Sequence, residues 1–275
     1  MAKAKAKAKS LKSKKPSQKA ALENLNKWNI GLAILLVQQT ILFLILSRSY
    51  SPPVTTNYLT TDTLASQASG GTILAPATHH LFDVNLIVLV TAILLIGAIS
   101  YALLASVLRK KYEADLRKGL NKFRWLTHIV GGGLVLITVA LLNGISDFST
   151  LLAIFSLSEI FGLFALLVES RKELSQHPRV VNKIAFVAFI TPWLITAFYL
   201  FGSQILGDRS LPAHVYWLDG TIFLLFVAKI VNNYLHSRKY KRWADYFYME
   251  RNYMLLSFLV KSALAWQVFF AVLNP

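Results

Sequence analysis

The chain contains no cysteine among its 275 residues. This absence excludes disulfide bonds, catalytic thiolates and cysteine-based metal sites. Acidic residues are also few, with 13 against 29 lysines and arginines. A phosphate-binding loop, a dinucleotide-binding glycine turn and a His-x-x-x-His pair are missing as well, and no Ser–His–Asp set can be proposed. The adjacent His79 and His80 are only a weak metal signal. We therefore expect neither an enzyme nor a metal protein.

Apolar residues are what the chain has in abundance. They make up 55% of the sequence, and the mean hydropathy is +0.50. Seven segments are long and apolar enough to cross a bilayer. They are approximately residues 27–48, 84–108, 124–145, 149–169, 183–203, 211–235 and 251–273. The sequence thus predicts an all-α membrane protein, a seven-transmembrane helix bundle with no room for a soluble domain.

The net charge of +16 is distributed very unevenly. Of the 29 basic residues, 25 fall in the amino-terminal segment and in every second loop, whereas the opposite loops hold only Arg48 and Arg209. Positive loops face the cytoplasm in membrane proteins. We therefore predict a multi-pass cell-membrane protein with a cytoplasmic amino terminus and an extracellular carboxyl terminus. This topology and contact with anionic lipids explain the charge, so nucleic-acid binding is not expected.

Two segments outside the spans have their own character. Residues 1–26 are rich in Ala, Lys and Ser and lack the apolar core of a signal peptide, so we expect a basic disordered cytoplasmic tail that is not cleaved. The bundle domain then covers residues 27–275. Between the first two spans, β-branched runs on both sides of Gly70 and Gly71 predict an outer β-hairpin lying on the bundle. A flexible loop is the alternative.

Lys261 lies near the middle of the last apolar segment. It is about ten residues from Arg251, or roughly 15 Å along a helix, which is too far for its amine to reach water easily. A buried ammonium is costly, by about 3 kcal/mol on insertion scales. A neutral amine is instead a nucleophile that forms an imine with an aldehyde. Pairing with a carboxylate on a neighbouring span, or lining a water pocket, remains the alternative.

Five other polar or aromatic residues stand out within the spans or at their ends. Glu159 lies near mid-depth, and intramembrane carboxylates seldom face lipid. Asp219 and Trp193 are likewise expected inside the bundle, the latter next to Pro192. Lys229 is about two turns from the end of its span, so we expect its amine to reach water by extending along the surface. Glu169 is at a span end, where we expect only contact with water.

The sequence resembles the heliorhodopsins, a family of retinal-binding proteins with inverted topology. The retinal-lysine motif of that family is similar to Glu250–Gln267 here, with Lys261 at the lysine position. Pro53–Thr56 and Pro76–Asp83 resemble its outer loop, and Arg124-Trp125 resembles the start of its third span. Gly144–Asp147, Pro192-Trp193 and Pro212–Tyr216 also match, so the resemblance covers about residues 26–273 in order.

The resemblance implies all-trans retinal bound as a Schiff base on Lys261 and isomerised by light. It also implies a homodimer. A tight aromatic pocket selects the isomer in such proteins, and the candidate walls here are Trp193, Phe223 and Trp266. Each of these rings could equally serve bundle packing.

The sequence departs from the family pattern around the Schiff base. The family usually has glutamate as counterion where this chain has Thr127, and an aromatic residue where it has His128. Histidines usual in the first two spans are replaced by Leu35 and Tyr101. Three outcomes follow: a neutral imine absorbing in the near ultraviolet, which we favour; an anion such as chloride held with Thr127 and His128; or a carboxylate from elsewhere, Glu159 or Asp219.

Pumping is not expected, because a pump needs titratable groups along the whole path across the bilayer. We predict a photosensory, signalling protein with an unidentified cytoplasmic partner. The alternatives are a light-gated ion or proton channel, and a retinoid- or lipid-binding membrane protein without photochemistry. Photocurrents would identify the first alternative, and bound ligand without a light-induced spectral change would identify the second.

Overall fold

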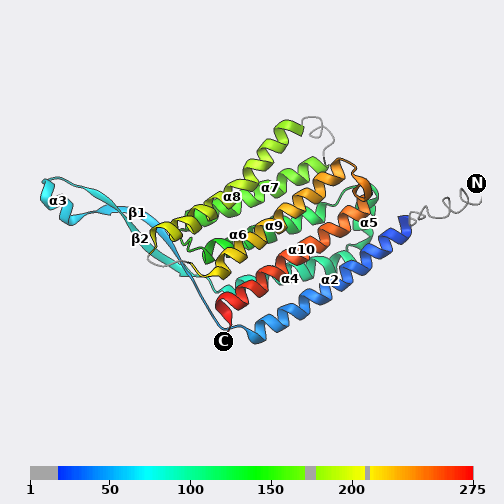
Figure 1. Cartoon of the computed structure of the whole chain (residues 1–275), viewed down its shortest axis with the longest axis horizontal. Helices are drawn as coiled ribbons and strands as arrows, with labels where there is room; N and C mark the ends of the chain where they lie inside the picture. Colours follow the sequence, from blue (N-terminus) through cyan, green and yellow to red (C-terminus); the bar gives the residue numbers. More distant parts are fainter. Residues whose placement is uncertain (1–17, 171–177, 208–210, 275) are drawn as a thin grey trace, which may run out of the picture.

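Seven long helices form the body of the computed structural model, which describes residues 18–170, 178–207 and 211–274 (Figure 1). Each is apolar enough to cross a membrane over at least part of its length. The helices are α2 (Gln18–Leu46), α4 (Leu86–Ala105), α6 (Lys122–Leu142), α7 (Phe148–Ser170), α8 (Pro178–Leu206), α9 (Ala213–Ser237) and α10 (Tyr246–Val268). The prediction of a seven-helix membrane bundle is therefore confirmed.

The helices pack side by side, and α6 and α10 each contact several neighbours. Along the chain α2 packs on α4, α4 on α6, α6 on α7 and α7 on α8, while α10 packs on α9, α2 and α4. Helix α6 is the most enclosed of the seven spans. Gly133 permits its close contact with α7, because a Cβ atom there would lie 2.5 Å from the Phe155 ring. The glycine triplet at 131–133 thus serves helix packing at this position.

Helix α2 begins earlier than the predicted first span. Residues 18–26, assigned from sequence to the basic tail, are helical and continue into the apolar part of α2. Leu22 and Leu25 are already buried there. The remainder of the predicted tail, residues 1–17, lies outside the described residues.

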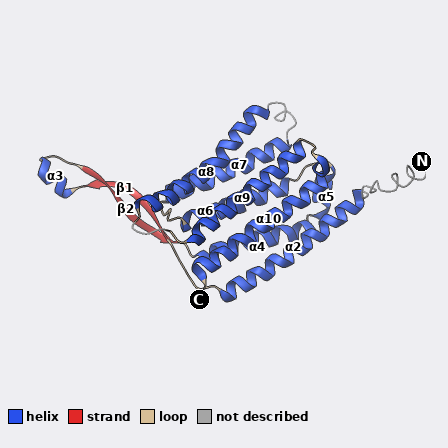
Figure 2. Ribbon diagram, in the orientation of Figure 1, coloured by secondary structure: helices blue, strands red, loops and turns tan. Residues whose placement is uncertain are grey.

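A two-stranded antiparallel sheet joins α2 to α4, as Figure 2 shows. Strand β1 (Pro53–Thr61) pairs with β2 (Leu74–Asp83), with an irregularity between Val54 and Thr55. The predicted hairpin is therefore confirmed. Its tip holds a short helix, α3 (Thr63–Ser69), that we did not predict. Asp62 caps this helix by accepting a hydrogen bond from the Ala65 amide, and Gly70 ends it in the left-handed conformation.

Only the base of the hairpin touches the bundle. Val54 is buried, and the Thr55 amide donates to the Ser146 carbonyl in the turn between α6 and α7. The paired strands and α3 then project away from the helices (Figure 1). The expectation that the hairpin lies along the bundle was thus wrong beyond its base (Figure 1), and no residue of β2 is buried.

Different short elements lie at the two ends of the bundle. At the hairpin end lie β1, β2 and the turn between α6 and α7. At the opposite end, which we call the basic end, lie the short helix α5 (Arg109–Arg117) and the 3-10 turn η2 (Lys241–Ala244). A π-helical turn, η3 (Phe269–Leu273), continues α10.

Candidate functional site

Lys261 lies inside the bundle, near the middle of α10. Its side chain is only 6% exposed. It is 15 residues from the start of α10 and 12 from the end of η3, or about 22 and 18 Å along a helix. The Nζ atom donates to Ser257 Oγ at 3.0 Å and to the Ser257 carbonyl at 3.3 Å. Among the described residues Lys261 forms no ion pair with a carboxylate.

A glycine on α4 makes room for the Lys261 stem. A Cβ atom on Gly97 would lie 2.8 Å from both Cδ and Cε of Lys261, closer than real Cβ contacts allow. It would also lie 2.9 Å from Leu36 Cδ1. The close approach of α4 therefore directs the lysine stem along a groove that any larger residue would close.

Aromatic rings from four helices meet beside α10 and form a pocket. Trp193 on α8 contacts Phe223 and Phe226 on α9, with ring centroids 5.1 and 5.7 Å apart. His128 on α6 contacts Phe226 at 6.0 Å. Phe161 of α7 extends the cluster. A cavity of about 10 Å³ remains between His128, Trp193, Phe226 and their neighbours.

The pocket has chemistry suited to a conjugated apolar ligand. Trp193 is 6% exposed, and its Nε1 atom has no hydrogen-bond partner although it is buried. The walls are otherwise flat rings, which bury large apolar areas in offset and edge contacts. The cavity that remains between the rings has room for no more than about one water molecule.

A second, polar cavity lies on the basic side of Lys261. Its volume is about 30 Å³, and its lining includes Thr127, Tyr101 and Ser257. Tyr101 donates to the Met254 carbonyl at 3.0 Å, and Thr127 donates to the Phe123 carbonyl at 2.9 Å in its own helix. The hydroxyl of Thr127 is thus already used by the backbone.

The far wall of this polar cavity carries unpaired groups. They are both amide atoms of Asn29, the Tyr112 and Tyr253 hydroxyls and Arg124 Nε. A polar cavity of this size holds about two waters, which these groups can bind. Burial also raises the pKa of the Tyr112 hydroxyl on α5 well above its usual value, so this phenol stays neutral.

His128 and Lys229 are in contact between the two cavities. Lys229 is 7% exposed, and its Nζ atom lies 3.4 Å from His128 Nδ1. The expectation that the Lys229 amine reaches water was therefore wrong. The amine turns inward because α6 presents the His128 ring, and α10 the Tyr253 ring, at the same level.

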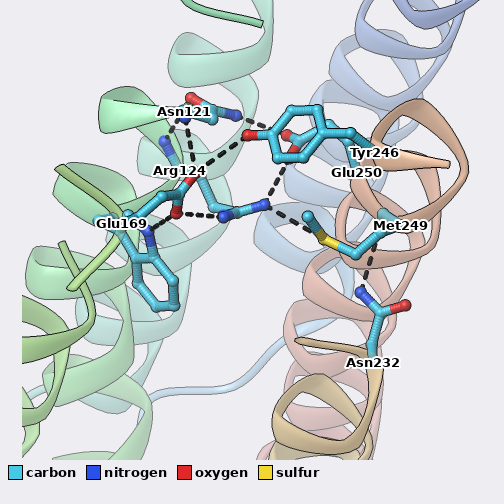
Figure 3. Close-up of polar contacts among 8 residues, drawn as sticks. Asn121, Arg124, Glu169, Asn232, Tyr246, Met249 and Glu250 are labelled. Carbon is cyan, nitrogen blue, oxygen red and sulfur yellow. Dashed lines mark hydrogen bonds and ion pairs between the residues drawn. The ribbon is translucent and has the colours of Figure 1, made fainter. Parts of the chain in front are cut away.

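A buried ionic network closes the basic end of the bundle (Figure 3). Arg124 on α6 pairs with Glu169 on α7 and with Glu250 on α10. Glu169 also accepts hydrogen bonds from the Trp125 indole and from the Tyr246 hydroxyl. The expectation that Glu169 merely contacts water was wrong, because α6 and α10 both bring donors to it. Its position at a span end gave no sign of this.

The two carboxylates considered as substitute counterions lie elsewhere. Glu159 on α7 sits beside α6, where a Cβ atom on Gly133 would lie 2.9 Å from its Oε1 atom. Asp219 on α9 accepts a hydrogen bond of 2.8 Å from Asn143, at the hairpin end of α6. Neither forms an ion pair with Lys261 among the described residues.

The structure brings most of the sequence-selected residues into two groups. Trp193, Phe223 and His128 share the aromatic pocket. Thr127 and Tyr101 line the polar cavity. Trp266 lies apart from both, since its ring contacts are Phe269 and Phe270 toward the end of α10. Phe226 also lines the pocket, and Lys229 contacts His128 beside it. Both residues could be placed in the span from the sequence, but the direction of their side chains could not.

The comparison with protein families gives a direct result. The heliorhodopsin family model matches residues 25–273, which is nearly the whole chain. The chain belongs to the heliorhodopsin family. This membership and the seven spans identify a retinal-binding, rhodopsin-type, multi-pass membrane protein. A search of curated proteins finds no match.

Proposed function

We propose that this heliorhodopsin is a light sensor that binds all-trans retinal as a Schiff base on Lys261. The observation that carries the proposal is the burial of Lys261 near mid-membrane, with Ser257 as its hydrogen-bond partner and no carboxylate paired to it among the described residues. An amine so placed is poorly stabilised as an ammonium and available to an aldehyde. When bound, retinal supplies the absorption of light and the isomerisation of a double bond.

We propose that the residues around Lys261 have different roles in holding this ligand. Gly97 leaves space for the lysine stem, and Ser257 orients its nitrogen. The rings of Trp193, Phe223 and Phe226 supply an apolar wall that excludes water. Such a wall also restricts the shapes a polyene can adopt.

We further propose that the Schiff base is neutral at physiological pH and absorbs in the near ultraviolet. Its neighbours support this. Thr127 stands at the family's counterion position, and its hydroxyl donates a hydrogen bond to the backbone carbonyl of Phe123. Glu159 lies beside Gly133, and Asp219 is hydrogen-bonded to Asn143. A protonated imine without a nearby negative charge in a buried site is disfavoured. An anion held with Thr127 and His128 is the competing possibility, and a chloride-dependent visible band would identify it.

A sensory role fits the distribution of charge better than ion transport does. The interior offers an aromatic pocket and a closed Arg124–Glu169–Glu250 network instead of a continuous polar path. We propose a cytoplasmic basic end, an extracellular hairpin, a homodimer and a signalling partner that contacts the basic loops. Light-dependent currents under voltage clamp would contradict the sensory assignment and favour a channel.

The test of the attachment site is chemical. Retinal is added to the purified protein, the imine is reduced with borohydride, and the modified peptide is identified by mass spectrometry. We expect one retinyl group on the peptide that contains Lys261, and none in Lys261→Arg, which keeps the charge. An unchanged retinal spectrum in Lys261→Ala would overturn the proposal.

A further inference from the structure

A wide cleft lies between the start of α2 and α5 at the basic end (Figure 1). Its volume is about 350 Å³, far larger than that of the two interior cavities. The residues that line it are Gln18, Lys19, Leu22 and Glu23 of α2 and Arg109, Glu113 and Arg117 of α5. Leu22 is buried, whereas Lys19, Glu23 and Arg117 are exposed. The cleft therefore combines a buried apolar residue with charged side chains that a ligand can reach.

The charged groups of the cleft have both signs and are only partly paired. Glu113 accepts a hydrogen bond of 2.8 Å from Arg109 Nε, but lies 4.0 Å from Arg117 Nη2, too far for a hydrogen bond. A guanidinium has five N–H donors, so most donors of these two arginines are left over. Lys19 and Glu23 form no ion pair with another described residue. The cleft thus offers cations to an anionic group and a carboxylate, that of Glu23, to a cationic one.

The cleft lies at the edge of the membrane-spanning part of the chain. Val107, two residues before Arg109, is 80% exposed although it is apolar, and such a side chain at the end of a span is suited to lipid. On α2, Trp28 follows Glu23 by five residues, and tryptophan is enriched at the membrane–water interface. Five helical residues rise about 7.5 Å, close to the thickness of roughly 5 to 8 Å of one headgroup layer. Glu23 and Arg109 therefore lie at the level of the lipid headgroups.

We propose that this cleft binds the headgroup of a phospholipid that carries a primary ammonium, as phosphatidylethanolamine does. The phosphodiester of such a lipid is an anion that receives charge-assisted hydrogen bonds from Lys19, Arg109 and Arg117. Its ammonium has three N–H donors, and the Glu23 carboxylate accepts from them. The position at the membrane edge favours a lipid over a soluble phosphate ester. This site is separate from the retinal pocket and goes beyond the proposed light sensing.

The mixed charge of the cleft also explains why other common headgroups fit less well. A purely anionic headgroup, such as that of phosphatidylglycerol, brings no cation to the Glu23 carboxylate. A choline headgroup has a positive charge but no N–H donor, so it makes no hydrogen bond with Glu23. Selectivity for the primary ammonium is therefore the property that separates this site from general attraction of anionic lipid to the basic end.

Native mass spectrometry of the full-length protein in a neutral detergent tests this selectivity. Phosphatidylethanolamine, phosphatidylcholine and phosphatidylglycerol with the same acyl chains are added in equal amounts. Because exposed ion pairs are individually weak, we expect phosphatidylethanolamine to be retained only about three-fold or more above each of the others. Equal retention of the three lipids would overturn the inference. Stronger retention of phosphatidylglycerol would also overturn it, since the positive charge of the protein would then explain binding.

Glu23→Gln separates the two halves of the headgroup. This variant keeps the size of the side chain and removes the carboxylate, so retention of phosphatidylethanolamine should fall to the level of phosphatidylcholine, while that of phosphatidylglycerol should not fall. Asp83→Asn is the control, because Asp83 is an exposed carboxylate at the base of the hairpin. It should leave the preference unchanged. A preference that survives Glu23→Gln would overturn the proposed role of the ammonium.

Arg117→Gln tests the anionic half of the headgroup. We expect retention of phosphatidylethanolamine to fall about three-fold. Arg242→Gln is the matched control, since Arg242 is an exposed arginine of η2 at the same end of the bundle. An equal loss in both variants would mean that overall charge holds the lipid, which would overturn the site. Glycerophosphoethanolamine, the headgroup without acyl chains, should not displace the lipid at equal concentration, and displacement would contradict the choice of a lipid ligand.

Discussion

Two buried lysines on adjacent helices have different surroundings. Lys261 contacts Ser257 and the groove at Gly97, and among the described residues its nitrogen hydrogen-bonds only to Ser257 of its own helix. Lys229 meets an imidazole nitrogen and two ring faces. The two lysines therefore have different surroundings, because the neighbouring side chains differ.

The groove at Gly97 yields the first residue-scale prediction. In Gly97→Ala the new methyl group would displace Cδ and Cε of Lys261, which are flexible enough to move without unfolding the protein. Since a misplacement of about 1 Å can cost up to about 100-fold in rate, we expect retinal attachment to slow by about ten-fold or more. The mass of the borohydride-reduced protein, followed over time, measures this.

Gly31→Ala on α2 is the control for that variant, because a Cβ atom there would meet no atom within 4 Å. Its attachment rate should match the wild type. Equal rates in Gly97→Ala and the wild type would mean that the groove does not position Lys261.

Thr127 yields the second prediction. A glutamate at this position restores a carboxylate beside the polar cavity next to Ser257. Because a nearby negative charge stabilises a protonated imine, we expect Thr127→Glu to show a visible band at neutral pH. Thr127→Gln, which has the same size without the charge, should keep a near-ultraviolet band. A visible band in both variants, or in neither, would count against the charge argument.

At the scale of elements, three helices are joined by the Arg124 network. Arg124 comes from α6, Glu169 from α7 and Glu250 from α10, so the network fixes how these helices meet at the basic end (Figure 3). Removing one partner of a buried pair leaves an uncompensated charge.

The third prediction follows from that network. We expect Glu250→Ala to lower the free energy of unfolding by about 3 kcal/mol or more. Glu113→Ala on α5 breaks only the partly exposed pairs with Arg109 and Arg117, and should cost less than about 1 kcal/mol. Thermal unfolding of both variants in the same detergent gives the comparison. Equal losses in the two variants would show that the network adds little to the packing of α6 against α10.

The hairpin and the helices differ in how far the sequence predicted them. Long apolar runs define the spans, because crossing a bilayer demands about 20 such residues. Helix α3 is signalled only by Asp62 before it and Gly70 after it, and these residues also fit an ordinary turn. The projection of the hairpin could not be predicted, since it depends on the few contacts between Thr55 and the α6–α7 turn.

The candidate site likewise contains residues whose role the sequence predicted and residues whose role it did not. Lys261 is conspicuous as a charge within an apolar run. Lys229 and Glu169 lie nearer to span ends, where reaching water is the usual behaviour of charged side chains. Their inward direction depends on the rotation of α7 and α9, which places Tyr246, Tyr253 and His128 around them. Rotation about a helix axis in an apolar bundle is set by packing, and hydropathy does not reveal it.

At the scale of the whole molecule, the absence of cysteine makes the proposed orientation testable. Single cysteines at Thr60 in β1 and Ser237 at the end of α9 fall at opposite ends of the bundle, both exposed. In intact cells we expect a membrane-impermeant maleimide to label Thr60→Cys and not Ser237→Cys. Permeabilised cells should label both. The reverse pattern in intact cells would invert the proposed topology.

The absorption spectrum of the purified protein with all-trans retinal, titrated from acid to alkaline pH, tests the central claim most directly. The account predicts a bound near-ultraviolet band at neutral pH that becomes visible in acid and is lost in Lys261→Ala. A band that disappears when free retinal is removed, or one that Lys261→Ala retains unchanged, would contradict it.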